Sequence, residues 1–380
     1  MYKQLKYPPE AKILLDIISR EGRYQLDNVN PAILLELANQ HDITPLVFDK
    51  LKEYKPKIPQ DIYADLKYCY LFNLAKNRGF WNEFLKINQE FRQKNISFVP
   101  IKGMDILTRI YPELDLRSLS DIDILIKEKE FNLAQNLLYR MGYQKRLDGL
   151  KENYWKQEQC HIKFYKEPFL VEIHWGLDFK RGRMAILPRL WERTREITID
   201  NHRIITLSAE DAFFAFALHL RRFGNILALK QILDTARIIN QSSGFDWDYV
   251  LEESRRGKMR ATIYFILTQT KLFTSANIPE DFFIKLGLAS WRKRLIERFI
   301  STHTFQIRPS FKNNYLKAHM LLYDNLGEPI YYLIKIPYEQ FCKFYDLRPY
   351  GFRANLFYHM RFLYIPFKQI LYKWVKKEQK

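Results

Sequence analysis

Two aspartates, Asp121 and Asp123, lie two positions apart in the segment SDIDILI. Because side chains alternate between the two faces of a strand, this spacing predicts both carboxylates on one face and Ile122, Ile124 and Ile126 on the other. Neighbouring carboxylates repel each other, and a hard divalent cation such as Mg²⁺ or Mn²⁺ relieves that repulsion while it binds phosphate oxygens. The spacing therefore indicates a metal site for a phosphate substrate, and an edge strand with solvated acids stays open as the alternative.

A third acid, Glu172, occurs in a similar setting in the segment VEIHW. The strand period places Glu172 and His174 on one face, with Val171 and Ile173 on the other. Two neighbouring strands can then present three carboxylates, enough for two metal ions that activate an attacking hydroxyl and stabilise a leaving pyrophosphate. His174 is expected either to orient the acid and touch the substrate or to be satisfied by a neighbouring group.

A strand-to-helix junction is predicted at Lys102 and Gly103. Gly103 permits a close approach of the backbone, the start of the helix attracts phosphate, and Lys102 adds a cation. Further along the chain, Lys230 and Asp234 lie four positions apart on one face of a predicted helix. This spacing suits contacts with a triphosphate and a ribose. Residues four apart on a helix more often form an exposed ion pair with each other.

The residues around these motifs predict the elements that must position them. Apolar residues at three- and four-residue spacing indicate helices throughout residues 10–95, after which strands and helices alternate. From residue 208 onwards the pattern is mainly helical, beginning with a capping-box signal at Ser208 and Asp211. The strands are expected at residues 95–103, 120–126, 161–166, 169–175, 195–200 and 202–207. The later helices are expected at residues 104–111, 129–142, 209–223, 227–240, 247–256, 259–273 and 289–302.

The composition limits the classes of protein and partner. With 380 residues, 47% of them hydrophobic, the chain is long and apolar enough to fold. Lys+Arg 61 against Asp+Glu 43 gives a net charge of +18, which favours anionic partners without choosing among them. Three cysteines far apart form neither a disulfide framework nor a zinc motif, so a cytoplasmic location is expected. No stretch approaches the roughly 20 apolar residues that cross a bilayer.

The last 50 residues combine basic and aromatic side chains. They contain seven Lys and three Arg against three acids. This interleaving suits peripheral contact with the inner face of a membrane, whereas aromatic residues in a core beneath a solvated basic face are the more frequent arrangement.

The longest motif-bearing stretch, IKGMDILTRIYPELDLRSLSDIDILI, is followed by a helix ending in RMGY and then by VEIHWGL. This order resembles an uncharacterised bacterial nucleotidyltransferase family of the DNA polymerase beta-like superfamily, and the likeness covers roughly residues 10–250. The superfamily combines a glycine motif, a DxD or DxE strand and a third carboxylate on a later strand. Three features depart from its usual pattern: Met104 replaces a small hydroxyl residue, Gly103 and Asp121 are further apart, and the third acid is Glu172.

The resemblance implies an α+β fold in which a polymerase beta-like palm lies between helical parts. The boundaries expected are 1–95 for an N-terminal helical segment, 96–207 for the palm, 208–330 for a helical domain binding acceptor or nucleotide, and 331–380 for the basic aromatic segment.

The implied reaction moves an NMP group from an NTP such as ATP to a hydroxyl or phosphate of an unidentified acceptor, whether small molecule, glycan, protein or RNA. Asp121, Asp123 and Glu172 would bind the metal ions and carry the catalysis, with Glu172 or Asp123 as general base. The implied nucleotide-binding residues are Lys102, Gly103, Arg117 and Ser120.

Other functions also fit parts of the sequence. A DxD glycosyltransferase also fits the aspartate strand and the basic surface, but that fold normally places several strands before its DxD, and here only one is predicted. A nuclease would carry a lysine where His174 stands. An accessory protein that docks on a membrane or glycan through its C-terminal segment would have no reason to keep three costly acids together.

Overall fold

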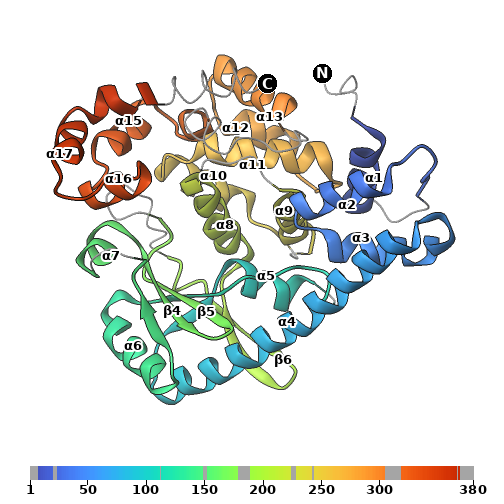
Figure 1. Ribbon diagram of the computed structural model, residues 1–380, viewed down its shortest axis with the longest axis horizontal. Coiled ribbons are helices and arrows are strands. Elements are labelled where there is room, and N and C mark those ends of the chain that lie inside the picture. The colour runs from blue at the N-terminus through green and yellow to red at the C-terminus, as the bar shows by residue number, and fades with distance from the viewer. Residues whose placement is uncertain are drawn as a thin grey trace.

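The computed structural model describes residues 7–19, 24–111, 113–148, 152–178, 189–223, 228–241, 244–303, 318–365 and 367–368 (Figure 1). Its helices are α1 Pro9–Ser19, α2 Pro31–Gln40, α3 Thr44–Leu51, α4 Gln60–Gln93, α5 Lys102–Ile110, α6 Phe131–Arg140, α7 Glu152–Glu158, α8 Ala209–Phe223, α9 Leu229–Gln241, α10 Trp247–Arg256, α11 Arg260–Phe273, α12 Glu280–Lys285, α13 Ser290–His303, α15 Gly327–Ile334, α16 Tyr338–Phe344 and α17 Phe352–His359. Short 3-10 helices, η1 Lys52–Lys57 and η2 Glu128–Glu130, precede α4 and α6. The strands are β1 Phe98–Pro100, β2 Ile122–Ile126, β3 Gln144–Arg146, β4 His161–Lys166, β5 Phe169–His174, β6 Arg195–Ile199 and β7 His202–Thr206.

The predicted N-terminal helices are confirmed, and the last of them, α4, is 34 residues long. Its buried side chains recur at three- and four-residue intervals, as expected for a helix that packs one face on the rest of the protein. Figure 1 shows α4 running along one side of the molecule, from α3 to the region of the sheet. This long helix therefore connects the N-terminal helices with the strands that carry the acids.

The five-stranded sheet has the order β1-β2-β5-β4-β3. Strand β2 pairs antiparallel with β1 and parallel with β5, while β4 pairs antiparallel with both β5 and β3. All five residues of β2 are buried, because it lies inside the sheet and is covered on both faces. The strands predicted around the two acidic motifs are thus confirmed, and they are direct neighbours.

Two elements in this region were not predicted, the edge strand of the sheet and the helix after it. Strand β3, with the sequence QKR, carries no apolar alternation and is defined only by its pairing with β4. Helix α7 follows it. The weaker predicted strand pair is confirmed as β6 and β7, which form a separate hairpin. Its turn residues Asp200 and Asn201 both have positive φ, the conformation that a two-residue hairpin turn requires.

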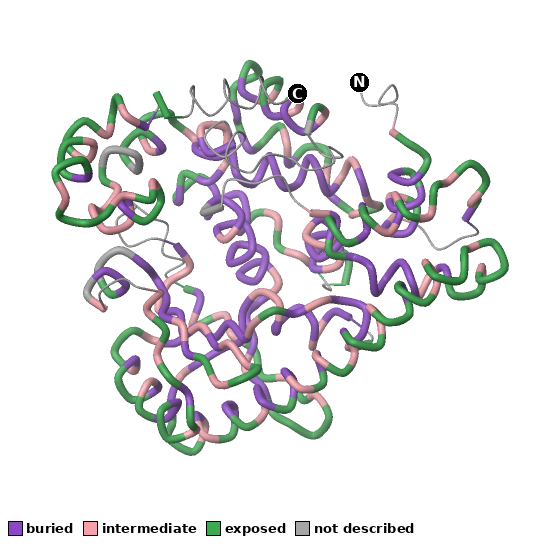
Figure 2. Tube along the Cα trace, viewed as in Figure 1, coloured by how far each residue is buried: buried purple, intermediate pink, exposed green. Residues whose placement is uncertain are grey.

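The later helices form the other half of the molecule, with α8 and α9 next to α5 (Figure 1). The predicted cap is present at the start of α8, where the backbone N–H of Asp211 donates to Ser208 Oγ at 3.1 Å. Figure 2 shows α8 buried along most of its length. One hydrophobic cluster extends from Ile13 to Leu322, so the helical half and the sheet share a core.

A smaller cluster lies in the C-terminal segment, built on Phe341, Cys342, Ala354 and Ile365. Other aromatic residues there face solvent, with Phe352 81% exposed. The predicted basic aromatic segment thus has both a small core and exposed rings, and its residues 369–380 lie outside the described part of the chain. Among the described helices, none combines the length and apolar character that crossing a bilayer requires.

The fold is a mixed one, with many helices and a small sheet of parallel and antiparallel strands, so the predicted α+β class is confirmed. The four predicted domain boundaries stay predictions.

Candidate active site

The carboxylates of Asp123 and Glu172 lie side by side on neighbouring strands. Parallel pairing of β2 with β5 sets Asp123 opposite Glu172, so both side chains point to the same face of the sheet. Asp121 immediately precedes β2 and, two residues before Asp123, faces the same side. We call Asp121, Asp123 and Glu172 the acid cluster.

Two cationic groups converge on one oxygen of Asp123. Lys102 Nζ donates to Asp123 Oδ1 at 2.6 Å, and His174 Nε2 lies 2.8 Å from the same oxygen. Both groups also approach Glu172 Oε2, Lys102 at 4.0 Å and His174 at 3.3 Å. The lysine predicted to face a triphosphate therefore forms an ion pair within the acid cluster in this structure.

Burial and these contacts shift the acid-base properties of the site. Burial raises the pKa of Asp121 to about 6, and repulsion by Asp123 and Glu172 adds to the effect. Burial also opposes ionisation of Asp123, but Lys102 and His174 outweigh it and hold the pKa of Asp123 well below its usual range. Burial and Lys102 oppose the charge on His174, whereas its hydrogen bonds, first that to Asp123, raise its pKa to about 10. Lys102 is desolvated too, yet the two carboxylates beside it raise its pKa.

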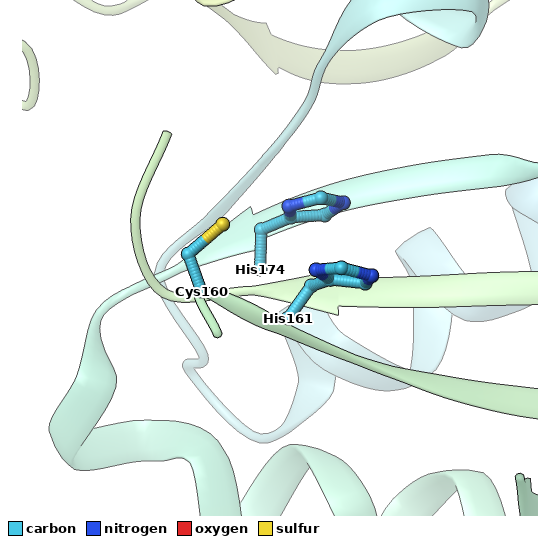
Figure 3. A group of neighbouring side chains, drawn as sticks. All are labelled: Cys160, His161 and His174. Carbon is cyan, nitrogen blue, oxygen red and sulfur yellow. The ribbon is translucent and has the colours of Figure 1, made fainter. Parts of the chain in front are cut away.

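Cys160, His161 and His174 form a buried group (Figure 3), and His174 contacts both Asp123 and Glu172 of the acid cluster. Figure 3 shows the two imidazole rings one above the other, and their centroids are 4.9 Å apart with 17° between the planes. Imidazole lone pairs lie in the ring plane, so stacked rings do not aim them at a common point as a tetrahedral metal centre requires. His161 Nε2 lies 3.7 Å from Glu172 Oε2, so the pair supports the carboxylates instead.

Arg117 reaches the site from the loop between α5 and β2. Its guanidinium forms a bidentate pair with Asp234 of α9, with Nη2 to Oδ2 at 2.9 Å and Nε to Oδ1 at 3.0 Å. Tyr111 also donates to Asp234 Oδ1, at 2.8 Å. Both members of the pair are buried, which fixes the orientation of the guanidinium.

Helix α4 holds the other side of the same loop. Asn77 Nδ2 donates to the carbonyl of Arg117 at 2.6 Å, and Asn73 Nδ2 donates to the carbonyl of Asp115 at 2.7 Å. Both asparagines are buried. The extra length between Gly103 and Asp121 therefore forms an anchored loop that carries Arg117 to the site.

Gly103 is required by a close approach within the chain. A Cβ atom there would lie 2.8 Å from Leu119 Cδ2 and 2.9 Å from Arg117 Nη1. Gly103 thus leaves room for Arg117 beside the first turn of α5. This role comes in addition to the predicted close approach of its backbone to phosphate.

Lys230 and Asp234 do not pair with each other, so the interpretation of these residues as an exposed ion pair is wrong. Asp234 is buried against Arg117, and Lys230 Nζ pairs with Asp42 at the turn between α2 and α3. Asp42 also accepts a hydrogen bond from Ser118 Oγ at 2.8 Å. Because helix packing across 188 residues creates the Lys230 contact, spacing within α9 gave no signal for it.

A pocket opens beside the acid cluster. The residues that line it are Lys102, Gly103, Arg117, Ser118, Leu119, Ser120, Asp121, Asp123, Phe216, His219, Lys230 and Gln231. All four residues predicted to bind nucleotide are among them, with Ser120 Oγ donating to Asp121 Oδ1 at 3.0 Å. Glu172, His174 and Asp234 are not in this lining, although each contacts a residue that is. The nucleotide role of all these residues stays a prediction.

His161 and His219 are two site residues whose position the sequence analysis did not predict. In the hairpin of β4 and β5, His161 pairs with His174 and Lys163 with Glu172. The two-residue turn at Glu167 and Pro168 fixes that register, so the signal for His161 was present in the sequence. The structure places His219 of α8 on the pocket wall.

The donor atoms of this site fit a hard divalent cation. Asp123, Glu172 and His174 offer ligand atoms that lie within 4.8 Å of one another, and Asp121 lines the pocket beside them. The Lys102 ammonium lying among these oxygens shows that the acid cluster accommodates positive charge. Asp121, Asp123 and Glu172 are therefore the residues that could hold Mg²⁺ or Mn²⁺.

An α+β fold that gathers carboxylates from neighbouring strands beside a pocket lined by lysine and arginine is typical of enzymes that transfer phosphorus-containing groups. A family model described as an uncharacterised nucleotidyltransferase matches residues 27–275, more than half of the chain. The chain therefore belongs to this nucleotidyltransferase family. No curated protein matches the chain. Family membership favours nucleotidyl transfer over the glycosyltransferase and accessory-protein alternatives.

Proposed function

We propose that the protein transfers an NMP group from an NTP to a hydroxyl or phosphate of an acceptor in a metal-dependent reaction. The observation that supports this most is the in-register placement of Asp123 and Glu172 on β2 and β5, with Asp121 beside them at a pocket lined by cations. Residues 96–207 would form a palm of the polymerase beta type. In its favour, a short helix joins β1 to β2, and the acids lie on two adjacent strands.

The divalent ions held by Asp121, Asp123 and Glu172 would supply charge neutralisation at the α-phosphate and at the leaving pyrophosphate. The remaining roles belong to the chain itself. Arg117, fixed by Asp234, presents part of its guanidinium to the pocket where phosphate oxygens would lie. Lys230 adds a second cation on the α9 side.

The proton of the attacking hydroxyl needs an acceptor in the acid cluster. Glu172 is the better candidate for this role, because Asp123 Oδ1 already accepts from His174. His161 and His174 both lie next to Glu172 Oε2 and help to keep this carboxylate in place. His174 would thus act as a positioning residue.

Thermal-shift measurements test this function. Mg²⁺ with an NTP should raise the melting temperature of the full chain, and Asp121→Asn together with Asp123→Asn should abolish that rise. Asp200→Asn, in the turn of the β6 and β7 hairpin where a positive φ suits asparagine, is the matched control and should keep it. Stabilisation by nucleotide sugars alone would contradict nucleotidyl transfer. Mass spectrometry after incubation with labelled NTP and candidate acceptors would then identify the acceptor.

The C-terminal segment is proposed to dock on an anionic membrane surface. Phe352, Phe362 and Phe367 are 81%, 62% and 59% exposed, and they are interspersed with basic residues such as Arg353 and Lys368. Flotation of the full chain with anionic liposomes, compared with Phe352→Ser/Phe362→Ser, tests this contact. Equal flotation of both proteins would contradict membrane docking through these phenylalanines.

A further inference from the structure

Lys102 differs from the other two basic side chains of the pocket in its partner. Arg117 pairs with Asp234 and Lys230 pairs with Asp42, neither of which belongs to the acid cluster. Lys102 lines the same pocket but pairs with Asp123, an expected metal ligand. Its ammonium therefore lies between the expected metal site and the expected phosphate site.

The contacts of Lys102 leave little room for a divalent cation on the same carboxylates. Its Nζ lies 2.6 Å from Asp123 Oδ1 and 4.0 Å from Glu172 Oε2, and the side chain is only 12% exposed. A divalent ion bound to the same carboxylates would lie about 2.0–2.1 Å from their oxygens, and thus close to the ammonium. Two like charges at that separation, shielded from water, repel strongly.

The backbone supports a dedicated role for this position. Lys102 is the first residue of α5 and has a φ of +54°, a conformation that side chains other than glycine and asparagine rarely adopt. Such strain persists only where the surrounding structure imposes it, and it occurs preferentially at functional sites. Here it directs a lysine side chain at the acid cluster from the start of a helix.

We propose that Lys102 is an internal counter-ion that competes with the divalent cation for Asp123, and that its displacement delivers the ammonium to the triphosphate. This inference rests on the proposed nucleotidyl transfer and adds an order to it. Cation binding to Asp123 releases Lys102, and the released ammonium then binds a phosphate oxygen in the pocket. Cation and nucleotide therefore strengthen each other's binding, and by linkage the effect is reciprocal.

Electron paramagnetic resonance of free Mn²⁺ measures the competition in the full chain. Lys102→Met keeps the length of the side chain without its charge, and Lys102→Gly also relieves the left-handed backbone, so a folding defect in the first is checked by the second. Both variants should bind Mn²⁺ alone about tenfold or more tightly than the wild type. Lys230→Met, which removes a pocket lysine outside the acid cluster, should leave the affinity for Mn²⁺ alone unchanged.

Addition of a non-hydrolysable NTP analogue completes the test. In the wild type the analogue should increase Mn²⁺ affinity, and in both Lys102 variants this increase should be largely lost. Unchanged or weaker Mn²⁺ binding by the Lys102 variants would overturn the competition, even if the analogue still acts on the wild type. Tighter Mn²⁺ binding by the variants, with no effect of the analogue on any protein, would uphold the competition and refute nucleotidyl transfer.

Discussion

Replacement of Gly103 by alanine tests the close packing of α5 against the Arg117 loop. The added methyl group would lie 2.8 Å from Leu119 Cδ2 and 2.9 Å from Arg117 Nη1, both shorter than carbon contacts tolerate. Neither neighbour can retreat freely, because Leu119 is buried and Arg117 is held by Asp234. Gly103→Ala should therefore destabilise the protein and displace the guanidinium.

The magnitude follows from two opposing effects. Overpacking of a filled core costs about 1–3 kcal/mol, and alanine gains about 0.5–1 kcal/mol over glycine within a helix. Gly103→Ala should thus lower the free energy of unfolding by up to about 2.5 kcal/mol. Gly79 in α4 provides the matched control, because a methyl group there meets Phe169 at 3.7 Å, an ordinary contact. Gly79→Ala should retain only the helical gain of about 0.5–1 kcal/mol.

Urea unfolding followed by tryptophan fluorescence compares the three proteins, with the midpoint as the measured quantity. The order expected is Gly79→Ala, then wild type, then Gly103→Ala, from most to least stable. Nucleotide stabilisation in the thermal-shift assay should fall in Gly103→Ala alone, because Arg117 moves. If Gly103→Ala is as stable as Gly79→Ala, the loop does not pack on α5 as described, and the explanation of this glycine fails.

Three further changes test other contacts of the site. Asp234→Asn should cost about 3–5 kcal/mol in urea unfolding, because it leaves the buried guanidinium of Arg117 without a counter-charge. Asn77→Ala should cost about 1–3 kcal/mol, because a buried carbonyl of the Arg117 loop loses its donor, and nucleotide stabilisation should weaken with it. Asp121→Asn should stabilise the metal-free protein by about 1–2 kcal/mol at pH 7.5, measured by urea unfolding in chelator, and by little at pH 4.5.

The sign of the pH effect comes from the raised pKa. In the unfolded chain Asp121 ionises near its usual pKa, whereas in the folded protein it holds its proton up to about pH 6. Stability is therefore lost as pH rises from about 4 to about 6, and asparagine avoids that loss. An equal gain at both pH values would contradict this origin. For the buried pair, the double variant Arg117→Met/Asp234→Leu should recover much of the stability lost in Asp234→Asn. A double variant less stable than Asp234→Asn would refute the explanation by an unpaired charge.

Periodicity was sufficient to predict most of the fold, because most elements bury one face. The strand period of two placed Asp121 and Asp123 together, and the same period placed Glu172 with His174. The two-residue turn at Glu167 and Pro168 also sets the register of β4 with β5, although that register was not predicted. In contrast, β3 could not be predicted, because the sequence QKR has no apolar alternation and the edge strand is defined by its backbone pairing with β4.

Contacts between distant elements were beyond reach of the sequence. Nothing in the spacing of α9 indicated that Asp234 would bind Arg117 while Lys230 binds Asp42, since both contacts depend on how helices pack. Likewise, the predicted phosphate cation Lys102 was recognised by its place after β1, but its partner Asp123 emerged only from the pairing of strands. Local chemistry was predictable, and the pairing of charges was not.

The pairing of each basic side chain with an acid affects how a ligand arrives. Lys102, Arg117 and Lys230 line the pocket, and their partners are Asp123, Asp234 and Asp42, with Asp121 as a further acid. Beyond a Debye length of about 10 Å, such matched charges cancel for an approaching polyphosphate. Long-range steering must therefore come from the basic residues outside the pocket, which give the chain its net charge of +18, and its dependence on ionic strength reports on them. The pocket itself acts only on a ligand that is already in contact with it. It therefore affects the dissociation rate of the ligand more than the association rate.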